Sequence, residues 1–496
     1  MRRYWIPTVL TGMLLIGSCF TKSVQAAKEK HGEKTYYFAA FMDGKKMGYV
    51  THTRTQENAR VTNSEHVIFT IKRADVAMTI SVKETYIETS KGQPLAFESM
   101  QYLGALGMTV KGKKNAQGKY DVTITTGSNV QKKTIDWPEG ALMAEGAELL
   151  AQEKGFQPGT RYTAKIFVPM MLQAMDVEIE IGEKKQIDLL GRVIQCTEVI
   201  NTMKMPTGRI VSTNYIDENH LPQKMIIPVM GMNFEMVACT REFALSENDV
   251  PEFLEQLILH SPKPLKNYKT AKQIKYHLEP QPGVKLTVVQ DDNQKVTGDG
   301  QKGLYVTVKP LEDPRGVTFP YQGKNKIARE ALKPTRFLQN DSEKIVKLAK
   351  KAVGETQDAA QAARNIEGFV REYVKEKSLS VGYASAVEVA ASREGDCSEH
   401  AVLTAAMCQA VGIPARLALG YIYVDQWAGK ENIFVGHAWT QAYVGGKWIA
   451  LDGTRGPNGY TAGHLTLAVG NGNPEDFFSL VMFQGQFKIT EIEMYR

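Results

Sequence analysis

The sequence predicts an α+β protein, with a β-rich N-terminal part and a C-terminal part that combines helices with a hairpin of strands. Three observations lead to this prediction. Apolar and polar residues alternate in short runs up to about residue 245, and the apolar period changes to about 3.6 residues beyond residue 341. The last third then contains a well-delimited helix followed by two strands joined at a Gly-Gly turn.

Length and composition favour a globular protein of two or three compact units, because the chain has 496 residues and an ordinary domain has roughly 100 to 200. Hydrophobic residues make up 43% of the chain and charged residues 23%, so cores can form and disorder is not indicated. The formal net charge of +6 is small for this length, and we expect no nucleic-acid partner.

The first residues, MRRYWIPTVLTGMLLIGSCF, combine a short basic start with an apolar run, the pattern of a secretory signal. Two processing sites stay open. Val24-Gln25-Ala26 suits signal peptidase and gives a signal peptide over 1–26, whereas Ile16-Gly17-Ser18-Cys19 resembles a lipobox and gives a lipoprotein signal ending before Cys19. An uncleaved anchor is disfavoured because the run is short and interrupted. We expect an exported protein of the periplasm or cell envelope, either free of the membrane or anchored to it only by a lipid at Cys19, depending on which of the two sites is used.

Residues 35–245 are expected to form a β-rich domain, since runs such as VIFTIKR, DVTITT and MDVEIEIG alternate between turn residues. One helix is expected in EGALMAEGAELLAQEKG, ending at Gly155. No pattern here indicates chemistry, so the domain either recognises an envelope partner or positions the C-terminal part. Cys196 and Cys239 lie in strand-like runs and are either a disulfide or two buried free thiols.

Residues 246–334 are expected to be a connector or a small β module, with strand-like VKLTVV and LYVTVK and a turn-rich stretch over 291–303. Residues 335–496 are expected to form the last domain. It opens with the helical patterns SEKIVKLAKKAV and ETQDAAQAARNIEGFVREYVKEK, whose charged residues fit solvated helix faces.

The segment EGDCSEHAVLTAAMCQAVGIP predicts a helix with Asp396 at its N-cap and Glu399 completing a capping box, stopped by Gly412 and Pro414. Cys397 then falls in the first turn. Unpaired backbone N–H groups and the positive end of the helix dipole favour a thiolate there, which is where a nucleophilic sulfur is expected.

Cys408 lies on the same helix about 16 Å further along its axis, so it cannot reach Cys397 and is assigned to the core. A metal site built from Cys397 and His400 lacks a CxxC pair or a second pair of histidines. We expect no metal and no cofactor.

The segment FVGHAWTQAYVGGKWIALDGT predicts a hairpin with its turn at Gly445-Gly446. Counting outward from the turn, Tyr443 opposes Trp448 and Trp439 opposes position 452, which places the two tryptophans either in an acyl or peptide groove or in the core.

In this register His437 lies on the same face as Asp452 and diagonal to it. A carboxylate at that position can hold the imidazole's orientation and tautomer. Together with Cys397 the pattern predicts a catalytic triad, with Cys397 as nucleophile, His437 as general base and later acid, and Asp452 as orienting group.

The order Cys397, His437, Asp452, with GDCSEHAVLTAAMCQAVGIPARLALGY and GHAWTQAYVGGKWIALDGT around them, resembles the transglutaminase-like superfamily over about residues 335–470. The resemblance implies a C-terminal papain-like fold, in which the cysteine-bearing helix packs on an antiparallel sheet. It also implies that the oxyanion is held by the backbone N–H of the nucleophile and an upstream side chain. The upstream segment has no Gln, which leaves Tyr383 for that role.

The chain looks like bacterial members of this superfamily, because no acidic loop resembles the calcium sites of the animal cross-linking enzymes. The implied activity is that of a cysteine protease, amidase or acyltransferase acting on a protein or peptide substrate. Two other functions stay open: a deglycosylating amidase with the same triad, and a non-catalytic cell-envelope binding or assembly module that retains the fold.

Overall fold

The structure, a computed structural model of the chain, divides into two compact units, one ending and the other beginning between Phe253 and Leu254. The predicted signal over 1–26, which includes Cys19, lies outside the described residues, and so does Tyr383. Strands account for 52% of the structure and helices for 18%, which confirms the strand-rich α+β class. The described residues are 33–73, 76–103, 106–126, 129–205, 208–229, 232–250, 258–375, 384–456, 458–471 and 485–495.

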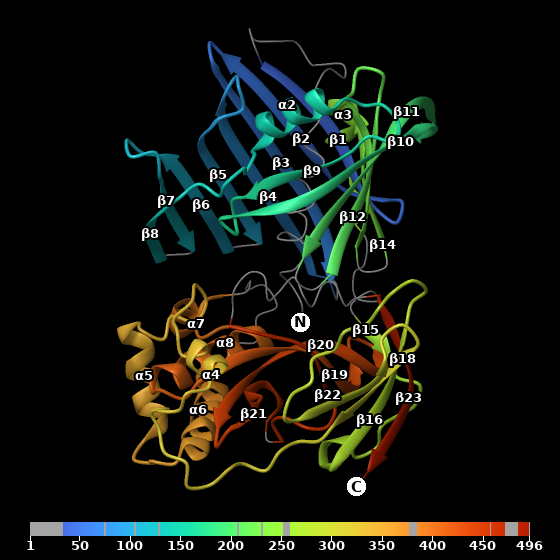
Figure 1. Cartoon of the computed structure of the whole chain (residues 1–496). Coiled ribbons are helices and arrows are strands. Elements are labelled where there is room, and N and C mark those ends of the chain that lie inside the picture. Colours follow the sequence, from blue (N-terminus) through green and yellow to red (C-terminus); the bar gives the residue numbers. More distant parts are fainter. Residues whose placement is uncertain are drawn as a thin grey trace. The chain divides into compact units, whose positions relative to one another are not determined.

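The N-terminal unit is built on one 14-stranded sheet in the order β8-β7-β6-β5-β4-β3-β2-β1-β14-β13-β12-β11-β10-β9 (Figure 1). Every neighbouring pair is antiparallel, and the pairing of β1 with β14 joins the two halves. The strands are β1 (Glu33–Met42), β2 (Lys45–Glu57), β3 (Arg60–Arg73), β4 (Val76–Thr89), β5 (Pro94–Leu103), β6 (Leu106–Lys114), β7 (Tyr120–Thr126), β8 (Asn129–Ile135), β9 (Arg161–Val168), β10 (Gln173–Leu189), β11 (Arg192–Met205), β12 (Gly208–Ile216), β13 (Pro222–Val229) and β14 (Met232–Cys239).

The core of this unit lies between the two arms of the curved sheet. Phe97 of β5 and Phe167 of β9, from opposite arms, pack with ring centroids 4.8 Å apart. Helix α2 (Ala144–Lys154) contacts β3, β4 and β9 and so lies between the arms. It ends as predicted, with Gly155 at the C-cap, where the positive φ of 79° favours glycine. A short helix that the sequence analysis does not predict, α3 (Arg241–Ala244), follows β14.

The alternative of a disulfide between Cys196 and Cys239 is wrong, because both cysteines are free. Cys196 lies in β11 and Cys239 in β14, with β12 and β13 between them. At about 4.8 Å per strand spacing, the two sulfurs are too far apart to bridge.

The C-terminal unit contains two sheets and a group of helices (Figure 1). One sheet has the order β15-β20-β19-β22, with β21 also paired to β20, and the other has the order β17-β18-β16-β23. Residues 258–334, expected as a connector or small β module, share this unit with residues 335–495 and supply strands to both sheets. The strands are β15 (Ile258–His260), β16 (Gln273–Pro280), β17 (Gln294–Asp299), β18 (Gly303–Val308), β19 (Ala415–Trp427), β20 (Lys430–Val444), β21 (Lys447–Leu451), β22 (His464–Gly470) and β23 (Phe487–Tyr495).

Two local expectations for this region were wrong. VKLTVV (284–289) is not a strand, and the turn-rich stretch contains β17. The sequence LYVTVK supplies β18, and β17 pairs with it as an antiparallel hairpin.

The helices of the C-terminal unit surround α8 (Cys397–Ala410), which packs on β19 and β20. The two predicted amphipathic helices are α5 (Glu343–Val353) and α6 (Ala359–Tyr373), and both contact α8. The structure adds α4 (Lys326–Glu330) and α7 (Ala386–Ser392). Among the described residues, no helix is long and apolar enough to cross a membrane.

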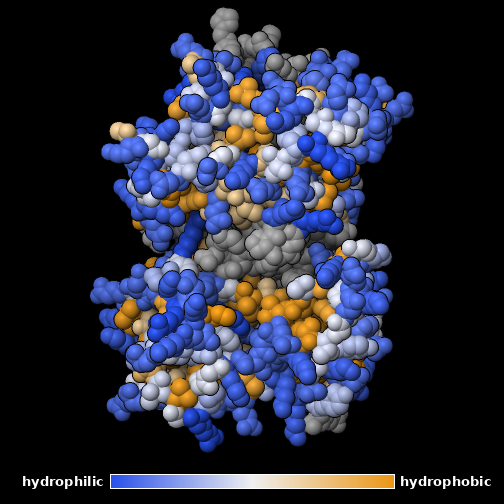
Figure 2. All heavy atoms as spheres, viewed as in Figure 1, coloured by the Kyte–Doolittle hydropathy of each residue, from blue (hydrophilic) through white to orange (hydrophobic). Residues whose placement is uncertain are grey.

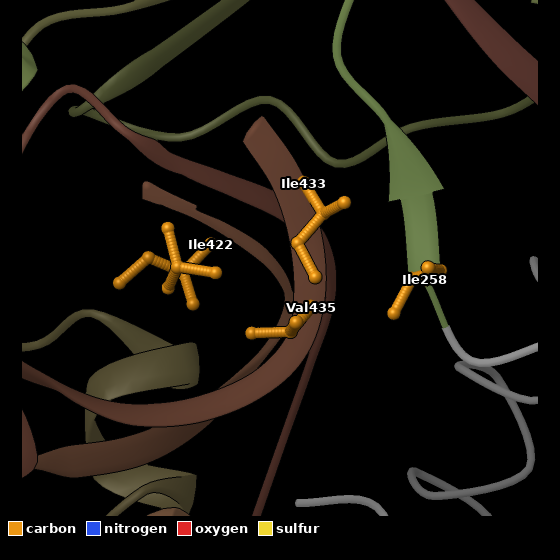
Figure 3. Packing of buried hydrophobic residues seen from close by; sticks show 5 residues of the cluster. Ile258, Ile422, Ile433 and Val435 are labelled. Atoms are coloured by element: carbon orange, nitrogen blue, oxygen red, sulfur yellow. The ribbon is translucent and has the colours of Figure 1, made fainter. Parts of the chain in front are cut away.

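A group of buried aliphatic side chains joins the short edge strand β15 to the centre of its sheet (Figure 3). Trp427, at the end of β19, packs against this group. Hydrophobic residues also gather at the surface in the area where Figure 1 labels β15, β19 and β20 (Figure 2). The members of the buried group are Ile258, Ile422, Val424, Ile433 and Val435.

Candidate active site

The start of α8 fixes the position of Cys397. The Asp396 side chain accepts from the backbone N–H of Ser398, and the Glu399 carboxylate accepts from the backbone N–H of Asp396 at 3.0 Å, so the predicted capping box is present. Gly395 allows this turn, because a Cβ there would lie 2.3 Å from the Cβ of Glu399. Cys397 is the first helical residue and its side chain is buried.

Cys408 is a core residue, as the helix geometry predicts. Its thiol is completely buried on α8. Burial, with a smaller effect of the Glu367 charge, raises the pKa of the Cys408 thiol well above its ordinary value. A thiol in this state is not a nucleophile at neutral pH.

The hairpin of β20 and β21 has the predicted register. Tyr443 opposes Trp448, and the turn residues Gly445 and Gly446 have φ of 60° and 84°, the left-handed pair of a tight two-residue turn. The ladder ends where Thr440 opposes Leu451, one residue before Asp452. A change in that register would turn the side chains of this strand to the opposite face.

His437 and Asp452 meet as this register requires: His437 Nε2 lies 2.7 Å from Asp452 Oδ2, with both side chains buried. The contact occupies Nε2, which leaves Nδ1 as the ring nitrogen for Cys397. The Cys397 side chain forms a hydrogen bond with this imidazole. The structure therefore brings together all three predicted residues.

The electrostatics of His437 and Asp452 favour an ion pair between these two residues. Burial alone would lower the pKa of His437, but the charges of Asp452 and Cys397 and their hydrogen bonds raise it to about 10. Burial alone would raise the pKa of Asp452, but His437 and His464 hold it well below its ordinary range. At neutral pH His437 is thus an imidazolium beside an ionised Asp452.

His464 is a site residue that the sequence analysis did not identify. Its Nε2 lies 2.9 Å from Asp452 Oδ2, the oxygen that also contacts His437. Burial lowers the pKa of His464, so the ring is neutral, and the backbone N–H of Thr461 donates to its Nδ1 at 3.1 Å. The ionised Asp452 carboxylate can only accept, so the proton of the neutral ring is on Nε2 and points at Asp452.

The other Asp452 oxygen is also occupied. Thr454 donates to Oδ1 from its backbone N–H at 3.0 Å and from its hydroxyl at 2.5 Å. The backbone N–H of Asp452 donates to Glu367 of α6 at 2.5 Å, and Arg364 contacts both Glu367 and Asp313. Helix α6 thus holds the turn that carries the carboxylate.

Both tryptophans of the hairpin belong to the core. Trp439 is completely buried and Trp448 nearly so, and neither lines the cavity at Cys397. The Arg416 guanidinium lies 4.0 Å from the centroid of the Trp448 ring. The tryptophan that does line this cavity is Trp427, and the Tyr268 ring lines it as well.

A cavity of about 390 Å³ opens beside Cys397 and His437. This volume suits a small ligand or one or two residues of a peptide. The backbone N–H of Cys397 lies in the first turn of α8, where no intrahelical acceptor exists for it.

Among the described residues, His437, Asp452 and His464 are also a group that could hold a metal ion, since their ligand atoms lie within 4.8 Å of one another. Each imidazole already directs its Nε2 at the Asp452 carboxylate. A metal bound to both rings through Nε2 would have to replace these two hydrogen bonds.

Residues 346–453 match the family model of the transglutaminase-like superfamily. The chain therefore carries a domain of this superfamily, whose members are usually cysteine proteases or acyltransferases. No curated protein matches the chain.

Three solved structures are similar to it at TM-scores below 0.5. A candidate cysteine protease from Cytophaga hutchinsonii has 21% identity and a TM-score of 0.31, and the match covers 45% of this chain and 90% of that one. A β-barrel-like protein of a domain of unknown function from Brucella abortus has 10% identity and a TM-score of 0.33, with 44% and 98% covered. A candidate protease from Parabacteroides distasonis has 10% identity and a TM-score of 0.19, with 80% and 70% covered.

Proposed function

We propose that the protein is an exported thiol enzyme that forms a thioester with an acyl group at Cys397 and passes that group to water or to an amine. The observation that carries the proposal is the position of the His437 ring, which contacts Asp452 through Nε2 and hydrogen-bonds to the Cys397 side chain. Nucleophile, acid–base group and orienting group are thus in contact in the order that acyl transfer needs.

The reaction begins with attack of the Cys397 thiolate on an amide carbonyl carbon. The carbonyl oxygen becomes an oxyanion, which the backbone N–H of Cys397 can stabilise at the start of α8. The His437 imidazolium gives its Nδ1 proton to the leaving amine, and the C–N bond breaks to leave the thioester.

In the second half of the reaction, neutral His437 removes a proton from water or from an acceptor amine as it attacks the thioester. Cys397 leaves as a thiolate, and the imidazolium is restored. Hydrolysis is the proposed default, which makes the protein a protease or amidase. Transfer to an amine makes it an acyltransferase on the same residues.

The test is the rate at which iodoacetamide alkylates Cys397 between about pH 6 and 9, read by mass spectrometry. In the native protein we expect fast alkylation that changes little over this range, because the protonated His437 is hydrogen-bonded to the Cys397 side chain. In His437→Ala the rate should fall below pH 7 and rise with pH as for an ordinary thiol, which titrates near 8.5.

Cys408→Ala is the matched control, because it removes a thiol from the same helix without touching the site, and its alkylation profile should match the native one. Slow alkylation of native Cys397 with an ordinary pH dependence would contradict the proposal. The non-catalytic envelope module would then be the better account.

A further inference from the structure

The cavity beside Cys397 continues into a second, smaller one of about 180 Å³. The two cavities share five lining residues and so form one groove, which runs from the nucleophile past the 3-10 turn η3 (Gly453–Arg455) toward His464. The shared residues are Tyr268, Lys269, Ile422, Thr454 and Arg455.

The smaller cavity is positively charged. Its lining includes Lys269 and Arg455, and no Asp or Glu is among the described residues that line it. The Arg455 guanidinium donates to the Tyr268 hydroxyl at 3.1 Å, and the Lys269 ammonium lies 5.9 Å from the centroid of the same ring. Tyr268 thus holds one cation and lies close to the other. His464 is neutral and adds no charge.

The larger cavity has a different character away from this junction. Val424, Val435 and Trp427 form an apolar wall that continues the buried group of Figure 3. Asp425, an exposed residue near the end of β19, also lines the larger cavity. An anionic ligand group is therefore repelled at the β19 end of the groove and attracted at the η3 end.

We propose that the acyl donor of this enzyme carries a carboxylate a few bonds from the reacting carbonyl and an apolar group beside it. The carboxylate binds between Lys269 and Arg455, and the apolar group lies against Val424 and Trp427. The substrate class is thus an acidic peptide or N-acyl amino acid with an apolar side chain. This inference rests on the proposed function, because it assumes that the acyl group reacts at Cys397.

The experiment uses two alkylating probes that differ only in charge, N-iodoacetyl-leucine and N-iodoacetyl-leucinamide. Both deliver a leucine side chain next to the reactive carbon, and only the first has a carboxylate. We expect the full-length native protein to react about three to ten times faster with the carboxylate probe, through tighter binding rather than a faster chemical step. The preference should shrink as salt is added.

Three variants test the two cations. Lys269→Gln and Arg455→Gln should each reduce the preference, and Lys269→Glu should reverse it. The His437 imidazolium also attracts the carboxylate but is present in every variant, so only the change between variants reports on the two cations. Lys447→Gln removes an exposed lysine that does not line the groove and should leave the preference unchanged.

The outcomes separate this inference from the proposed function. If both probes alkylate Cys397 quickly but the preference is the same in native protein, Lys269→Gln and Lys269→Glu, the carboxylate subsite is wrong and the thiol enzyme stands. Because Lys269 is exposed, these variants keep the fold even if Arg455→Gln does not. If neither probe reacts with Cys397 faster than it reacts with an ordinary thiol, both proposals fail.

Discussion

His464 and His437 contact the same carboxylate oxygen, Asp452 Oδ2, at 2.9 and 2.7 Å. An oxygen with two donors cannot turn away from His437 without also breaking its bond to His464. His464 therefore positions the carboxylate that orients His437.

Replacing His464 with Leu should slow alkylation of Cys397 by roughly tenfold at pH 6.5, because Asp452 loses one of the donors that fix it. His464→Gln should recover most of the rate, since its amide N–H can reach the position of Nε2. The two variants are compared by alkylation and by thermal unfolding. Equal rates in the Leu and Gln variants, or rates that simply follow their stability, would show that His464 only fills the core.

The close pairing of β22, which carries His464, with β19 depends on Gly420. Gly420 opposes His437 in the β19–β20 ladder, and the β19–β22 register shifts between Leu419 and Gly420. A Cβ at position 420 would lie 1.8 Å from the carbonyl oxygen of Leu465, a backbone atom that cannot move alone. The absence of a side chain therefore lets the two strands come together at this point.

Gly420→Ala should lower the free energy of unfolding by about 2 to 4 kcal/mol and slow alkylation of Cys397. Denaturant unfolding and mass spectrometry measure the two effects. Gly368→Ala is the matched control. Its Cβ would meet only an Arg371 side-chain nitrogen at 3.9 Å, and in the middle of α6 it should stabilise the protein by up to about 1 kcal/mol. If Gly420→Ala changes neither the free energy of unfolding nor the alkylation rate, β22 can shift to accommodate the methyl group.

Asp452→Asn should make the alkylation of Cys397 dependent on pH. The Asp452 carboxylate is the main group that raises the pKa of His437 to about 10 against the effect of burial. Without that charge burial lowers the pKa of His437, and the imidazolium that assists Cys397 is lost at pH 7. We expect a rate at least tenfold lower at pH 6 and within about threefold of native at pH 9.

The control for this variant is Asp425→Asn, which removes a carboxylate from the cavity lining but not from His437. Its pH profile should follow the native one. A flat profile in Asp452→Asn would show that Cys397 is activated by the helix start alone.

The sequence could predict those parts of the site that are local. A capping box spans four residues and sets Cys397 in the first turn, and a two-residue turn fixes the register that brings His437 to Asp452. Residues on segments without such a signal were missed. His464 reaches Asp452 only because β22 pairs with β19, and these two strands are far apart in the chain. No turn motif in the sequence predicts that pairing.

The same distinction holds for the fold. Alternation identified the strands of the N-terminal unit, and Gly155 identified the end of α2. Alternation could not show that β1 pairs with β14 and so joins the strands into one sheet. These are the first and last strands of the domain, and no local sequence signal connects them. It also marked residues 284–289 as a strand, where the structure has none.

A cluster of buried glutamates in the N-terminal unit leads to the last prediction. Glu84 of β4 accepts from the hydroxyls of Ser99, at 2.9 Å, and Tyr86. Glu88 of the same strand accepts from the backbone N–H of Glu145 at 2.7 Å, at the start of α2. Burial raises the pKa of each from 4.5 to about 7, against the opposing effect of these hydrogen bonds.

A carboxyl whose pKa is raised by folding binds its proton more tightly in the folded state, so it stabilises the fold at low pH. For Glu84 this contribution is complete below about pH 4.5 and is lost as the pH rises to about 7. The N-terminal unit should therefore be less stable at pH 8 than at pH 5.5. Each glutamate should contribute on the order of 2 kcal/mol to that difference.

Glu84→Gln keeps the shape without the titrating proton, so the variant should gain stability over the native protein as the pH rises from 5.5 to 8. Hydrogen exchange of peptides from β4, read by mass spectrometry in the full-length protein, reports on this unit alone. Glu57→Gln, at an exposed position on β2, should follow the native protein at both pH values. If Glu84→Gln and native protein lose protection in parallel between the two pH values, Glu84 is already ionised in the folded state and its burial is compensated by Ser99 and Tyr86.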